Sequence, residues 1–140
     1  MPTQLLMFRT DRLLLALDVC QHIRATLPRY LYDPGGEPKG TPWSFARILA
    51  TLERIFDTRQ IERFKAIACY CAATAEGLLV PLLIENRAAV GETEINVAVL
   101  IRAMRDSRSF ITDSDETLLR RFFSAIASGE LTEADFKEEA

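Results

Sequence analysis

One carboxylate falls within the longest apolar stretch of the sequence. Glu76 lies inside the 19-residue run 66–84, which otherwise consists almost wholly of apolar and small residues. A carboxylate in such surroundings must contact a cation, take up a proton or reach water. We expect a buried ion pair between Glu76 and an arginine of a neighbouring helix. The alternative is a ligand-binding or catalytic carboxylate, with a pocket near Glu76 at the helix break that Gly77 and Pro81 predict.

The cysteines and the single histidine do not form a recognisable metal or catalytic pattern. Cys69 and Cys71 are two positions apart, so on a helix their side chains point about 200° apart. No further cysteine or neighbouring histidine completes a set of four ligands. His22 follows Asp18 by four residues, a spacing that favours a surface pair. We therefore predict no metal, cofactor or catalytic residue, and we interpret Cys20, Cys69 and Cys71 as reduced core thiols.

A ridge of arginines is the candidate nucleic-acid contact. Arg102, Arg105 and Arg108 recur at every third position and could contact phosphates together. The favoured interpretation is a solvated face whose cations stabilise the C-terminal end of a helix. A formal net charge of -3 and a pI near 5.2 give no support for broad attachment to nucleic acid.

Four aromatic residues outside the regular apolar stripes are candidates for a partner-binding surface. Tyr30 and Tyr32 lie in the proline- and glycine-rich stretch 28–40 or beside it, Trp43 precedes the next apolar stripe, and Phe110 lies between two expected helices. Tyrosine and tryptophan are enriched at protein interfaces. Packing of the same rings over the end of a bundle is an alternative of equal weight.

Helices must position these residues, because the apolar residues recur at helical spacing nearly everywhere. Pro28 predicts the end of the first helix, and the stretch 28–40 is expected to be a surface loop. Thr41 followed by Pro42 predicts the start of the second helix. Asp57 with Gln60 predicts a capping box that opens the third. The expected helices are 10–27, 41–56, 57–84, a fourth after Thr93, a fifth within 112–129 and a short sixth after Thr132.

The third of these helices is expected at the centre of the fold. Apolar residues occupy both sides of 57–84, and a helix that is apolar all round belongs in a core. Its small residues let neighbouring helices approach closely. The sequence thus predicts an all-α, single-domain bundle of five to six helices over residues 1–140, ending in an acidic segment at 130–140.

Composition and cysteine usage favour a cytoplasmic protein. At 140 residues, with 49% hydrophobic and 26% charged residues, the chain has the composition of an ordinary globular domain. Its three cysteines favour a reducing compartment, and charged residues interrupt the apolar N-terminal stretch that a secretory signal would need. The run 66–84 is long enough to span a membrane, but Glu76 and Pro81 oppose that reading.

These features favour a non-enzymatic interaction or regulatory module that binds a protein partner or a second copy of itself. The alternatives are a nucleic-acid-binding accessory protein that uses the arginine ridge, and a small-ligand sensor or enzyme with its pocket near Glu76.

Overall fold

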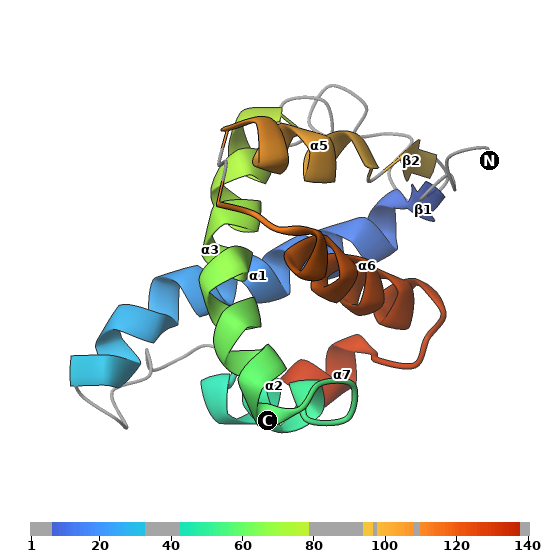
Figure 1. Cartoon of the computed structure of the whole chain (residues 1–140). Coiled ribbons are helices and arrows are strands. Elements are labelled where there is room, and N and C mark those ends of the chain that lie inside the picture. The colour runs from blue at the N-terminus through green and yellow to red at the C-terminus, as the bar shows by residue number, and fades with distance from the viewer. Residues whose placement is uncertain (1–6, 33–42, 79–93, 97, 108–109, 138–140) are drawn as a thin grey trace.

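The structure, a computed structural model, describes residues 7–32, 43–78, 94–96, 98–107 and 110–137 (Figure 1). Six helices lie within these residues, and the all-α prediction is confirmed. They are α1 (Thr10–Tyr32), α2 (Phe45–Leu52), α3 (Thr58–Leu78), α5 (Ala98–Ser107), α6 (Asp113–Ala127) and α7 (Glu133–Phe136).

Two short strands, which the sequence did not predict, lie beside the start of α1. β1 (Met7–Arg9) pairs antiparallel with β2 (Glu94–Asn96), with Phe8 opposite Ile95. Strands of three residues are too short to give a sustained alternation of apolar and polar positions. The helix expected after Thr93 therefore begins later, at Ala98 of α5.

The predicted end of the first helix at Pro28 is wrong. α1 continues through Pro28 to Tyr32, and the rest of the expected loop, 33–40, lies outside the described residues. A proline in a helix removes one backbone hydrogen bond but need not end the helix. α1 also packs against α2, α3 and α6, which stabilises the helix as a whole.

The second helix starts later and ends earlier than predicted. Ser44 is the N-cap of α2, and its hydroxyl accepts a hydrogen bond from the Arg47 backbone N–H at 3.3 Å. Thr41 and Pro42 lie outside the described residues.

The capping box before α3 is confirmed: the Asp57 N–H donates to Gln60 Oε1 at 2.9 Å, and the Gln60 N–H donates to Asp57 Oδ1 at 2.8 Å.

α3 occupies the centre of the fold, as predicted, and packs against α1, α5 and α6 (Figure 1). It is not apolar all round, because Glu62, Ala66 and Glu76 lie on an exposed side. The helix is described through Gly77 to Leu78, and the predicted break toward Pro81 falls outside the described residues.

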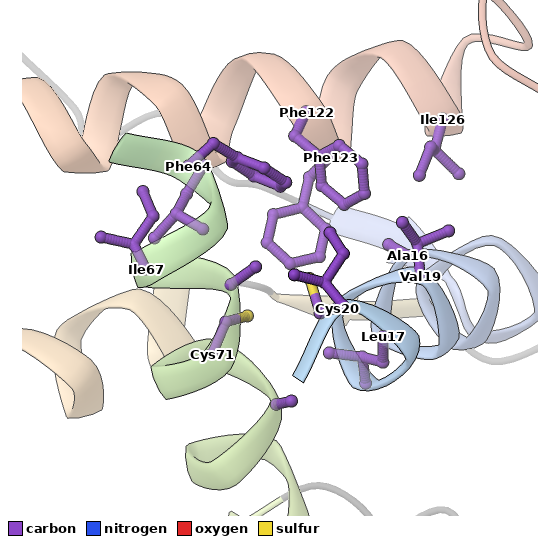
Figure 2. Close-up of a cluster of buried hydrophobic side chains, with 14 of the residues drawn as sticks. Ala16, Leu17, Val19, Cys20, Phe64, Ile67, Cys71, Phe122, Phe123 and Ile126 are labelled. Atoms are coloured by element: carbon purple, nitrogen blue, oxygen red, sulfur yellow. The ribbon is translucent and has the colours of Figure 1, made fainter. Parts of the chain in front are cut away.

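The core forms where α1, α3 and α6 meet (Figure 2). The rings of Phe64 and Phe122 lie 4.8 Å apart between centroids, and Phe122 contacts Phe123 edge to face at 5.8 Å. All three side chains are buried, and aromatic pairs of this geometry contribute about 1 kcal/mol each beyond the area they bury.

The acidic C-terminal segment is ordered by its packing on α2. The Thr51 hydroxyl donates to the Asp135 carbonyl at 2.7 Å, and Arg47 Nη2 donates to the Ala134 carbonyl at 2.9 Å. Phe136 of α7 is fully buried. The short sixth helix is thus confirmed, and residues 138–140 lie outside the described part.

Candidate functional site

A groove of about 250 Å³ lies between α1 and α3. Each helix contributes residues three and four positions apart, which places them on one face of that helix. The residues that line the groove are Leu14, Leu17, Asp18 and Gln21 of α1 and Ala72, Ala75 and Glu76 of α3. We call this feature the α1–α3 groove.

Small residues of α3 create the hollow. Ala72 and Ala75 carry only a methyl group, so they leave space beside Leu14 and Leu17 of α1. Both alanines and Leu17 are buried, and Leu14 is half-buried. The floor of the α1–α3 groove is therefore apolar, and its polar groups are two carboxylates and one amide.

Glu76 pairs with an arginine of a neighbouring helix, as predicted, but the pair is not buried. Arg24 Nη1 lies 3.0 Å from Glu76 Oε2, and the two side chains are 39% and 57% exposed. Arg24 Nη1 also lies 3.4 Å from Gln21 Oε1. Glu76 lies near the end of α3, where its side chain reaches solvent. It already has a cationic partner and is a weak candidate for binding a ligand's charge.

Asp18 is the second acidic residue of the α1–α3 groove, beside Glu76, and its sequence pattern did not indicate a binding site. Among the described residues, no group forms a hydrogen bond or ion pair with its carboxylate. The Asp18 residue is exposed, but the protein atoms beside it partly desolvate the carboxyl and raise its pKa; Lys137 lowers this pKa and Glu133 raises it. The expected partner, His22, instead makes a hydrogen bond with the Thr26 hydroxyl, at 3.1 Å. Only the fold reveals that Asp18 faces an apolar hollow.

The arginine ridge is partly neutralised by α6. Arg105 Nη1 lies 2.8 Å from Asp113 Oδ1 and 3.6 Å from Glu116 Oε1. The hydrogen bond to Asp113 raises the pKa of Arg105. Arg102 is exposed, and Arg108 lies outside the described residues. This arrangement favours a solvated charged face over a phosphate-binding surface.

Trp43 lies between two helices at one end of the bundle. Its ring stacks on His22 of α1 with centroids 5.7 Å apart, and Lys137 Nζ lies 4.7 Å from the ring centroid. Trp43 and Lys137 also form a backbone bridge. These contacts favour a packing role for Trp43 over an open binding surface.

The other aromatic candidates differ in exposure. Phe110 is 49% exposed and contacts Tyr70 of α3 edge to face at 5.1 Å between centroids. Tyr30 and Tyr32 belong to the last turn of α1, and the structure does not describe their side chains. Within the described part of the chain, Phe110 is the large apolar side chain most open to solvent.

The three cysteines differ in burial. Cys20 and Cys71 are buried as predicted, whereas Cys69 is only half-buried, and its thiol donates to the Lys65 carbonyl at 3.4 Å.

In the ranges that the structure describes, no group of three or more His, Cys, Asp and Glu side chains is placed to hold a metal ion. None of the described helices is long and apolar enough to cross a membrane.

The sequence matches no known protein-family model, and comparisons with curated proteins and solved structures give no significant match.

Proposed function

We propose that this chain is a non-enzymatic interaction module that binds a segment of a partner protein in the α1–α3 groove. The segment inserts an apolar side chain over Ala72 and Ala75 and places a lysine or arginine against Asp18. The observation that carries the proposal is the Asp18 carboxylate beside an apolar hollow, with no hydrogen bond or ion pair to any residue that the structure describes.

The size of the groove supports a peptide segment over a cofactor. Pockets for drug-sized ligands and cofactors typically enclose about 300–1,000 Å³. The 250 Å³ of the α1–α3 groove suits one or two side chains of a segment that lies across the two helices. Helical segments bind such grooves through anchors three or four positions apart.

The charges support a basic anchor. Arg24 already balances Glu76, whereas Asp18 has no ion-pair partner in the described chain. Asp18 is exposed at the edge of the apolar hollow, so a cation of the bound segment can reach it directly and pair with it as the segment covers the carboxylate. The arginine ridge supports the nucleic-acid alternative less well, because Arg105 is held by two carboxylates of α6.

We place this activity in the cytoplasm. Cys20 and Cys71 are free thiols packed in the core, which suits a reducing compartment.

Selection from a displayed library of random peptides tests the proposal. Peptides of about 16 residues span four helical turns. We expect the wild-type protein to enrich peptides in which a basic residue lies three or four positions from a large apolar one. Asp18→Asn should remove the basic preference, and Ala75→Ile, which fills the groove, should abolish enrichment. Asp106→Asn, an exposed acidic position on α5, is the matched control and should leave the selection unchanged.

Two outcomes would contradict the proposal. One is the absence of any enriched peptide class, or a class that Asp18→Asn and Ala75→Ile leave unchanged. The other is a dimer in sedimentation velocity that Ala75→Ile dissociates, because this would assign the α1–α3 groove to a second copy of the chain.

A further inference from the structure

Two buried thiols meet where α1 crosses α3. Cys20 of α1 and Cys71 of α3 both have 0% exposure, and their side chains lie on the facing sides of the two helices (Figure 2). A hydrogen bond with the Cys71 thiol, and then burial, raise the pKa of Cys20 well above its ordinary value. The fold thus brings to the same α1–α3 interface two thiols that are 51 positions apart in the sequence (71 minus 20).

We infer that Cys20 and Cys71 are an oxidative modification site at which a hydroperoxide forms a disulfide between α1 and α3. One thiolate attacks the outer oxygen of the hydroperoxide and the O–O bond breaks. The outer oxygen stays on the sulfur as a sulfenic acid, and the other oxygen leaves as an alcohol or water after taking up a proton. The second thiol attacks that sulfur and expels water. The two thiols lose two electrons, and the hydroperoxide gains them.

The fold selects this pair among the three cysteines. Once one thiol of this neighbouring pair is oxidised to a sulfenic acid, the other attacks it at a very high effective concentration. Cys69 bonds to the Lys65 carbonyl, and on the helix it points about 200° away from Cys71. Cys20 and Cys71 have no exposed surface in the closed fold, so the reaction proceeds through local opening and is slower than oxidation of an exposed thiol.

Treatment of the native protein with hydrogen peroxide tests the inference. We expect loss of two of the three thiols, a tryptic cross-link between the peptides that contain Cys20 and Cys71, and a rise in Tm of about 10 °C that dithiothreitol reverses. The variant Cys69→Ala keeps the pair and should give the same cross-link and shift. Cys71→Ala, checked for native circular dichroism, should give no intramolecular cross-link.

Three results would overturn the inference. They are retention of all three thiols at a peroxide dose that oxidises the urea-unfolded chain, a cross-link that involves Cys69, and loss of thiols only into dimers. The Cys69→Ala variant keeps the test decisive if Cys71→Ala does not fold.

Discussion

Arg63 of α3 donates two hydrogen bonds to the carboxylate of Asp115 at the start of α6. The Nε–Oδ1 and Nη2–Oδ2 distances are both 2.7 Å, and the Asp115 side chain is only 2% exposed. The same carboxylate accepts a hydrogen bond from the Thr112 backbone N–H at 2.9 Å, which completes the capping box of α6. One side chain thus fixes both the start of α6 and its docking on the central helix.

Replacing Asp115 should destabilise the protein more than replacing an exposed acid of the same turn. Asp115→Asn removes the charge that Arg63 contacts, and we expect a loss of about 2 kcal/mol in the free energy of unfolding. Asp113→Asn is the control, because the Asp113 side chain is 92% exposed, and this variant should lose less than about 0.5 kcal/mol in the free energy of unfolding. Urea unfolding at neutral pH measures both variants, and equal losses would contradict a stabilising role for the Arg63–Asp115 ion pair.

The same carboxylate should make stability depend on pH. The hydrogen bonds from Arg63 lower the pKa of Asp115, so the native state binds this proton more weakly than the unfolded state does. The stabilisation is complete above the unfolded pKa of about 4 and is lost as the pH falls through the lower native pKa. In urea unfolding from about pH 7 to pH 3, the free energy of unfolding should fall less for Asp115→Asn than for wild type. An equal fall in the two proteins would contradict the role assigned to Asp115.

Glu76 should contribute little to stability, although it lies on the central helix. Its ion pair with Arg24 is half exposed to water, and exposed pairs contribute about 1 kcal/mol or less. Glu76→Gln should therefore lower the free energy of unfolding by less than about 1 kcal/mol, close to the effect of Glu62→Gln on the exposed side of α3. The buried pair expected from the sequence would predict a loss of about 3 kcal/mol, and such a loss in urea unfolding would show that the pair is shielded from water.

Trp43 and Phe110 should respond differently to truncation. Trp43 is stacked on His22 beneath Lys137, so Trp43→Ala should destabilise the protein by about 2–3 kcal/mol. Phe110 is about half exposed, and Phe110→Ser should change stability by about 1 kcal/mol or less. Thermal unfolding followed by circular dichroism compares the two variants. A neutral Trp43→Ala would contradict the packing role of this ring.

Features determined by neighbouring residues were predictable from the sequence. The capping box of Asp57 and Gln60 and the short helix after Thr132 depend on side chains three positions apart, and both are present. The apolar face of α6, which includes Phe122 and Phe123, follows from helical spacing alone. The central position of α3 was also predicted correctly from its many apolar residues, although one side of the helix is exposed.

Features determined by distant contacts were not predictable. Arg63 and Asp115 are 52 positions apart, and nothing near either residue in the sequence indicates their pairing. Glu76 was expected to be buried because its neighbours on the chain are apolar, but its position on α3 faces solvent. Asp18 was expected to pair with His22, and only the packing of α1 on α3 places it in a groove.

A double-mutant cycle on a selected peptide measures whether Asp18 recognises the basic residue of the bound segment. The affinities of wild type and Asp18→Asn are measured by fluorescence anisotropy for the peptide and for a version whose basic residue is replaced by an uncharged one of similar length. We predict a coupling free energy of about 1–2 kcal/mol between Asp18 and the peptide cation. If the two changes instead add independently, Asp18 does not recognise the cation, and the proposed role of the α1–α3 groove is contradicted.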